Sequence, residues 1–181
     1  IRSEVLYILE DAANGLSTRG REIIQDLREQ WLEREARIHL YDDKLQAIAE
    51  ENPVCQRLLS IPGIGPINAT LLYSHAGDPK NYKTARHFSA ALGLVPKQHA
   101  SGGKEKLLGI SKQGNKHVRK QLVHGARSAY IVLQKKGNDS RLAKWVRRMD
   151  GKHPNKIVVG LANKLARIAW AIMKKEECYQ P

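Results

Sequence analysis

Residues 58–72 read Leu58-Leu59-Ser60-Ile61-Pro62-Gly63-Ile64-Gly65-Pro66-Ile67-Asn68-Ala69-Thr70-Leu71-Leu72 and place a Gly-Ile-Gly turn between two apolar segments. Pro62 and Pro66 flank the turn, and proline suits turns and the first position of a helix but not a helix interior. Ala69 is small enough to let two helices approach closely. The stretch therefore predicts a helix, a tight turn and a second helix.

This spacing resembles the helix-hairpin-helix motif. In that motif the glycines let backbone N–H groups approach a phosphate at a helix N-terminus, where the helix dipole also favours the anion. Gly63 and Gly65 are therefore candidate nucleic-acid contacts. The same hairpin can also be purely structural, and the sequence leaves both interpretations open.

Upstream of the turn, residues 17–51 carry apolar side chains at an alternating three-four spacing, which predicts one long helix with a heptad seam. The seam consists of Ile24, Leu27, Trp31, Arg34, Ile38, Tyr41, Leu45 and Ile48. Gly15 and Gly20 break the pattern, so a shorter helix is expected before it, at residues 4–13. We expect the seam to form a homo-oligomer through residues 17–51. The alternative is a helical hairpin within one chain that covers the same stripe.

The pair Asn52-Pro53 is expected to end the long helix, because the residue before a proline is pushed out of the α region. This places a boundary between residues 1–52, a helical linker or coiled coil, and residues 53–181, a second domain that binds nucleic acid.

In the second domain, capping residues and helical periodicity predict further helices. They run from a Thr84 cap to a stop at Gly93, from an Asn115 cap through Leu133, and over residues 142–149 and 155–176. No strand is expected, except at most a short one at residues 106–110. The predicted fold is mostly α: a long coiled-coil-like helix followed by a compact helical domain that contains the helix-hairpin-helix motif.

Charge is distributed unevenly along the chain. The formal net charge is +13, but residues 1–52 hold 7 Lys/Arg against 12 Asp/Glu, net −5, so residues 53–181 hold 24 against 6, net +18. A basic half of this kind is typical of a protein that binds nucleic acid. The candidate contacts are Lys97, Lys104, Lys106, Lys112, Lys116, Arg119 and Lys120. No apolar run approaches the roughly 20 residues that a membrane span needs, and there is no amino-terminal signal pattern, so we expect a cytoplasmic protein without a membrane partner.

Ser101 stands in a glycine-framed, cation-rich loop and is the candidate nucleophile. A serine hydroxyl attacks poorly unless a base, a metal or neighbouring cations assist it, and His99, Lys104 and Lys106 are close in sequence. Gly102 and Gly103 would let the backbone pass close to a DNA strand. A Ser-Gly-Gly segment is also an ordinary flexible turn, and Ser60 and Ser111 are rival serines.

No metal site is predicted in this chain. Its histidines show no ligand spacing, and the acids after residue 52 are scattered, so a two-metal nuclease site cannot be assembled from them. His124 lies on an apolar helix face and is interpreted as a core residue. Cys55 and Cys178 are far apart and have no second pair of metal ligands, which excludes a zinc site or a disulfide scaffold.

Several segments together resemble the carboxy-terminal half of insertion-sequence transposases of the one-ten family, in its eleven-eleven branch, which is related to the Piv-type DNA invertases. The resemblance covers residues 53–181 almost continuously, and residues 1–52 match the family's helical linker less specifically. It rests on Leu59-Ser-Ile-Pro-Gly-Ile-Gly-Pro, Phe88 through Gly93-Leu-Val-Pro, Ser101-Gly-Gly-Lys, Gly109-Ile-Ser-Lys-Gln-Gly-Asn, Arg119 to Leu122, and Leu161-Ala-Asn-Lys-Leu-Ala-Arg-Ile-Ala-Trp.

The resemblance implies a DNA recombinase that excises and inserts a mobile element in the bacterial nucleoid. In the family, an amino-terminal RuvC-like domain holds divalent metal, Mg²⁺, on a DEDD carboxylate set, a coiled coil follows, and a carboxy-terminal serine becomes linked to DNA. That serine corresponds to Ser101, and an RNA of the element guides the choice of DNA. This chain departs from the pattern because it has no RuvC-like segment, so we expect it to be incomplete and inactive alone. A non-catalytic helix-hairpin-helix module that binds DNA or RNA is the alternative.

Overall fold

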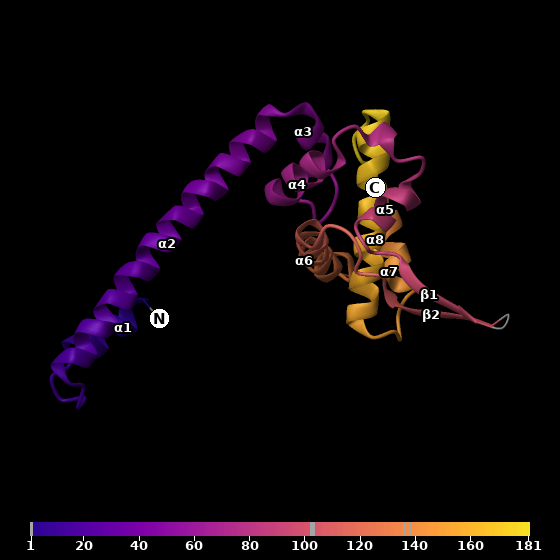
Figure 1. Cartoon of the computed structure of the whole chain (residues 1–181). Coiled ribbons are helices and arrows are strands. Elements are labelled where there is room, and N and C mark those ends of the chain that lie inside the picture. Colours follow the sequence, from indigo (N-terminus) through magenta and orange to yellow (C-terminus); the bar gives the residue numbers. More distant parts are fainter. Residues whose placement is uncertain (1, 102–103, 136, 138) are drawn as a thin grey trace. The chain divides into compact units, whose positions relative to one another are not determined.

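The computed structural model describes residues 2–101, 104–135, 137 and 139–181, with the backbone alone for residues 2, 3, 99–101 and 104–107. These residues form a mostly α-helical protein with one small antiparallel sheet (Figure 1). In chain order the elements are α1 (Arg2–Glu10), α2 (Thr18–Glu51), α3 (Pro53–Leu59), α4 (Pro66–Ala76), the 3₁₀ turn η1 (Pro79–Asn81), α5 (Ala85–Ala91), β1 (Pro96–Ser101), β2 (Lys104–Ile110), α6 (Lys116–Leu133), α7 (Arg141–Arg147) and α8 (Pro154–Lys175).

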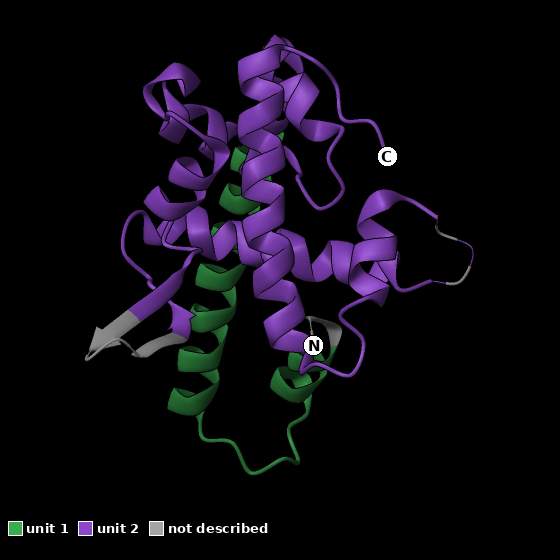
Figure 2. Ribbon diagram, turned by 90° about the vertical axis from the view of Figure 1, so that its right-hand side faces the viewer, with its two compact units in different colours: residues 1–44 green, residues 45–181 purple. Residues whose placement is uncertain are grey.

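The chain divides into two compact units, residues 1–44 and residues 45–181 (Figure 2). In the described residues, no helix is long and apolar enough to cross a lipid bilayer.

In the first unit, the guanidinium of Arg21 ties the end of α1 to the start of α2. It donates to the carbonyl oxygens of Leu9 at 2.5 Å and Asp11 at 2.7 Å, which the helix itself leaves without donors. The short helix is thus confirmed, but it ends at Glu10. The prediction that Gly20 interrupts the helix is wrong: Gly20 lies inside α2, whose start Ser17 caps by accepting a hydrogen bond from the Gly20 N–H at 3.1 Å.

The apolar stripe of α2 remains largely uncovered in this chain. Leu27 and Ile38 each keep 59% of their surface exposed, and Tyr41 keeps 54%. Within the first unit as described, α1 leaves these side chains exposed, and self-association through residues 17–51 stays a prediction.

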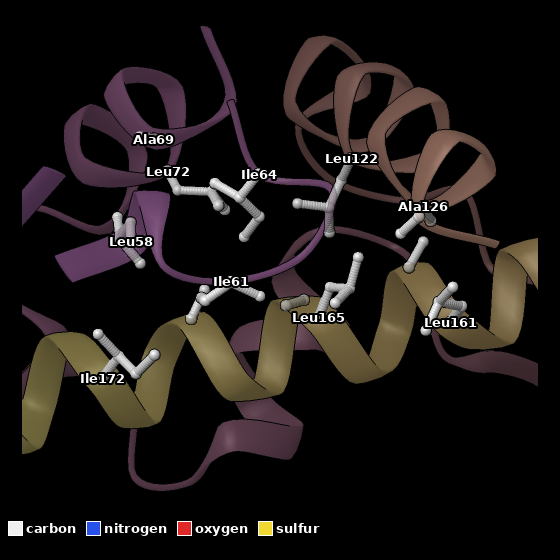
Figure 3. Packing of buried hydrophobic residues seen from close by; sticks show 14 of the residues in the cluster. Leu58, Ile61, Ile64, Ala69, Leu72, Leu122, Ala126, Leu161, Leu165 and Ile172 are labelled. Atoms are coloured by element: carbon white, nitrogen blue, oxygen red, sulfur yellow. The ribbon is translucent and has the colours of Figure 1, made fainter. Parts of the chain in front are cut away.

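The second unit is built around α8, which packs against α3, α5 and α6. Figure 3 shows Leu161, Leu165 and Ile172 of α8 facing side chains of α6 and of the α3–α4 segment. The expected apolar face of α6 is confirmed as buried: Val118, Leu122, Ala126, Ala129 and Leu133.

Side-chain caps begin the helices where the sequence places them. Asn52 Oδ1 accepts hydrogen bonds from the N–H groups of Val54 and Cys55, so α2 ends and α3 begins at the predicted proline. Thr84 caps α5 and Asn115 caps α6 in the same way.

The β-hairpin is the main departure from the predicted fold. Strand β1 pairs with β2 antiparallel, with Pro96 opposite Ile110 at the base and Ser101 opposite Lys104 at the far end. The prediction of at most a short strand at residues 106–110 is therefore wrong. These strands carry three lysines and only one β-branched residue, Ile110, so their intrinsic propensity is weak and the hairpin depends on the pairing between them. Gly102 and Gly103, between the strands, lie outside the described residues.

Candidate nucleic-acid interface

The segment between α3 and α4 forms the predicted tight turn. The Ile64 N–H donates to the Ile61 carbonyl at 3.0 Å, and Gly63 takes a φ of +84°, which a residue with a side chain rarely adopts. Pro66 starts α4, and the Ala69 N–H donates to the Gly65 carbonyl at 2.9 Å. The helix, turn and helix read from residues 58–72 are confirmed.

Gly63 is a packing residue in this turn. A Cβ on Gly63 would overlap the carbonyl oxygen of Gly125, in the middle of α6, and a Cβ on Gly125 would overlap the carbonyl oxygen of Gly63. Asn68 fastens the contact, because its Nδ2 donates to the carbonyls of Gly63 at 3.4 Å and Gln121 at 3.2 Å. Gly63 therefore has a structural role independent of any ligand.

Gly65 faces open space. Its backbone is extended at φ −93°, ψ −176°, no side chain caps the first turn of α4, and a Cβ at this position would meet nothing within 4 Å. The turn and α6 together line a hollow of about 630 Å³, to which α6 contributes Gln121, His124 and Ser128. Both predicted glycines line this hollow, but only at Gly65 would an added Cβ meet nothing.

The first turns of α6 present exposed cations. Lys112 precedes the helix, and Lys116 and Lys120 lie one turn apart on it; all three side chains are exposed and form no ion pair with any described carboxylate. They line a second hollow of about 390 Å³ with Arg119, Arg127 and His124. Because these charges are not neutralised within the described chain, they remain available to an anion.

Arg119 differs from its neighbours. It is half-buried, and its Nη1 donates to the Leu92 carbonyl at 3.0 Å, where α5 ends. It lines the second hollow, yet its guanidinium already holds the loop at Gly93, whose Cβ position would lie 2.9 Å from Nη1. We therefore assign Arg119 a positioning role beside the exposed lysines.

The prediction that His124 is a core residue is wrong, because its side chain is exposed. On a helix with 3.6 residues per turn, position 124 points away from the buried Leu122, at about 200°. His124 instead lines both hollows.

Ser101 ends β1, at the far end of the hairpin from its base. The backbone register places Lys104 opposite Ser101 and Lys106 opposite His99. The side chains of these four residues lie outside the described part, so their mutual geometry stays a prediction. Lys97, near the base of β1, is exposed.

The rival serine Ser60 has structural partners. Its Oγ donates to the Arg57 carbonyl at 2.6 Å and accepts from the Tyr179 N–H at 2.9 Å, which docks the carboxy-terminal tail on the turn. Ser111 is half-buried, and its N–H donates to the Val95 carbonyl at 2.8 Å next to the hairpin base. The Ser60 Oγ is therefore engaged in packing, whereas the contact of Ser111 is made by its backbone, and the choice of Ser101 as nucleophile stays a prediction.

Comparison with known proteins identifies the family of this chain. The family model described as "Transposase IS116/IS110/IS902 family" matches residues 55–141, which include both the turn and the hairpin. The chain belongs to this transposase family. It is 39% identical over 178 residues to the transposase for insertion sequence element IS1111A of Coxiella burnetii, an alignment that covers 98% of this chain and 48% of that protein.

Two further relatives extend the comparison. The transposase for insertion sequence element IS1328 of Yersinia enterocolitica is 47% identical over 143 residues, covering 78% of this chain and 39% of that protein. A probable family 20 transposase of Pseudomonas aeruginosa is 40% identical over 161 residues, covering 88% and 47%. The chain thus spans about half the length, or less, of these transposases.

In the part that the structure describes, no three His, Cys, Asp or Glu side chains come together as ligands. Four described residues have a shifted pKa, and none of them lines a hollow. Burial lowers the pKa of His75 and of Lys164, and the charge of Arg167 lowers the pKa of Lys164 further. Burial raises the pKa of Cys55 and of Tyr179.

Sequence reasoning missed Gly125, the partner of the turn. An isolated glycine inside a strongly helical pattern signals close packing, and that signal was present in residues 116–133. No sequence pattern indicates which segment packs against Gly125.

Proposed function

We propose that this chain is the carboxy-terminal, DNA-binding and serine-bearing part of a transposase that cuts and joins DNA at the ends of a mobile element. Its family membership supports the reaction class. The observation that carries the proposal is the hairpin. Its far end carries Ser101 with Lys104 opposite in register, and its base at Ile110 adjoins a cationic, acid-poor surface.

In the proposed reaction, Ser101 Oγ attacks the phosphorus of one phosphodiester in DNA. A bond forms between Oγ and phosphorus, one bridging oxygen leaves with its strand, and the hydroxyl proton passes to an acceptor, for which His99 is the candidate in this chain. The product is a phosphoserine link that the other strand's hydroxyl can later attack, which restores the serine. Lysines on the hairpin would offset the negative charge on the phosphate, and the lysines of α6, near the base of the hairpin, would hold the DNA beside it.

The reaction also requires parts that this chain does not supply. Its described carboxylates form no metal site, so we propose that a RuvC-like domain provides the Mg²⁺ and that the active site is composite. We further propose an RNA guide, a homo-oligomer through α2, and action on DNA in the bacterial cytoplasm.

A non-catalytic helix-hairpin-helix module is the second candidate. It is favoured by the open space beside Gly65 and by the unpaired lysines of α6, since neither feature requires Ser101. Both candidates bind nucleic acid, and they differ only in whether a covalent link forms.

A covalent-adduct assay separates the two candidates. The 181-residue chain, alone and joined to a RuvC-like domain of the same family, is incubated with Mg²⁺, guide RNA and labelled element-end DNA, and the products are resolved under denaturing conditions. We expect an adduct only with the joined protein. Ser101→Ala should abolish the adduct and leave DNA binding within about twofold, because the cations remain, whereas Ser111→Ala serves as the matched control. An adduct that persists in Ser101→Ala would contradict the catalytic proposal and favour the binding module.

A further inference from the structure

Three hollows of the second unit share lining residues. The hollow beside the turn and the hollow on α6 share His124. A third hollow, of about 840 Å³, lies between the base of the hairpin and the first turns of α8, and shares Ile110, Lys112 and Val159 with the second. Taken in this order, the hollows lie beside the helix-hairpin-helix turn, on α6 and at the base of the hairpin.

The charged side chains that line the hollows are all cations. The second and third hollows are lined by six cations and no carboxylate: Lys112, Lys116, Arg119, Lys120, Arg127 and Lys156. The four lysines form no ion pair with a described acid. The guanidinium of Arg127 donates to Asn155 Oδ1 at 3.2 Å, a neutral partner that positions the charge without cancelling it.

The third hollow is also partly apolar. Leu94, Leu108 and Val159 contribute to its wall, and Leu108 keeps 44% of its surface exposed. The third hollow thus combines two cations, Lys112 and Lys156, with apolar side chains, and cations are among the groups that contact the phosphates of a nucleic acid.

We propose that these three neighbouring hollows form one groove, the backbone track, that it holds the phosphodiester backbone of the DNA strand that leads to the hairpin, and that His124, Arg127 and Lys156 are contacts along it. The inference rests on the proposed function and deepens it by adding these three residues and removing Arg119 from the direct contacts. DNA is the occupant because the track ends at Pro96 and Ile110, the paired base of the hairpin that carries Ser101. A strand on this path continues toward that serine, and the strand that the serine attacks is DNA.

The test compares two triple variants of the whole chain with the same loss of charge. The track variant carries Lys116→Gln, Lys120→Gln and Lys156→Gln. The control carries Lys80→Gln, Lys83→Gln and Lys175→Gln, three exposed lysines that line none of the hollows. Affinity for duplex element-end DNA is measured over a series of salt concentrations, and thermal unfolding verifies that both variants are folded.

We expect the track variant to reduce the magnitude of the negative slope of log K against log salt by about 2.7, because each lost phosphate contact removes about 0.9, and to weaken binding about tenfold or more near physiological salt. The control should bind within about twofold of the unchanged chain, since it retains all track contacts. Two single variants within α8 isolate one newly assigned contact. Lys156→Gln should reduce the magnitude of the salt slope by about 0.9, and Lys175→Gln should leave the slope unchanged.

Equal losses in the two triple variants would overturn the track, because net charge alone would then explain binding. A loss confined to single-stranded RNA of equal length, with duplex DNA unaffected, would also overturn it, since the groove would hold RNA. If the unchanged chain bound no DNA at all, the proposed function itself would fail, which distinguishes that outcome from failure of the track.

Discussion

Gly63, in the turn between α3 and α4, lies directly against Gly125, in the middle of α6, and neither position has room for a Cβ. The contact joins the helix-hairpin-helix turn to the helix that presents the cations of the backbone track. The turn and these cations therefore keep one fixed relation within the second unit.

Gly125→Ala should destabilise the protein even though alanine favours helices. The overlap with the Gly63 carbonyl should cost about 1–3 kcal/mol of the free energy of unfolding, against a gain of about 1 kcal/mol in helix propensity. Gly20→Ala, inside α2, is the control with the same propensity gain, because its nearest neighbour there is the Ser17 Oγ at 3.3 Å. Denaturant unfolding measures both, and a stabilised Gly125→Ala would contradict the contact.

Gly65→Asp should weaken DNA binding without unfolding the protein. Aspartate is a good N-cap for α4, so stability should hold or rise, while its charge would repel a phosphate next to the turn. Gly65→Asn is the neutral control with the same shape, and Asn81→Asp, which lines none of the hollows, controls for net charge. If Gly65→Asp bound DNA as tightly as Gly65→Asn, the turn would have a structural role only.

Arg119→Leu should lower the free energy of unfolding by about 1 kcal/mol, because the Leu92 carbonyl loses its donor. Lys116→Leu, an exposed cation one turn earlier, should leave stability nearly unchanged. If Arg119 contacted a phosphate directly, Arg119→Leu would also weaken DNA binding and reduce its dependence on salt. An Arg119→Leu protein that is as stable as the unchanged chain but binds DNA with a weaker salt dependence would therefore contradict the positioning role.

Stability should fall with decreasing pH because of His75. Burial lowers the pKa of its imidazole from 6.5, and its Nε2 is buried without a hydrogen-bond partner among the described residues. The unfolded chain then binds a proton more readily than the folded one, so stability is fully present above about pH 6.5 and declines as pH falls below that value. His75→Leu should flatten this part of the profile of unfolding free energy against pH, and His87→Leu, at an exposed histidine, should not.

Ile38→Asp should reduce self-association through α2, and Leu40→Asp should not. The two side chains are 59% and 51% exposed, but only Ile38 lies on the heptad seam. Sedimentation at several protein concentrations distinguishes the two variants. Equal masses for both would show that the seam does not join copies of this chain.

Local patterns in the sequence predicted most of the helices. The caps at Asn52, Thr84 and Asn115 and the apolar spacing in residues 116–133 depend on residues at most four apart, so they can be read without knowing the fold. The hairpin could not be predicted from such local patterns. Pro96 and Ile110 pair across fourteen positions, and strand pairing depends on the partner strand rather than on propensity alone.

The sequence by itself determined that the chain is mostly helical, that its second half carries the positive charge, and that a glycine turn and a glycine-framed serine stand within that half. Only the tertiary structure decided which glycine packs and which stays open, that Arg119 holds a carbonyl, and that His124 is exposed and lines two hollows. The reason is physical: composition and spacing encode contacts within one helical turn, whereas burial, close approach and the joining of surfaces depend on which distant segments pack together.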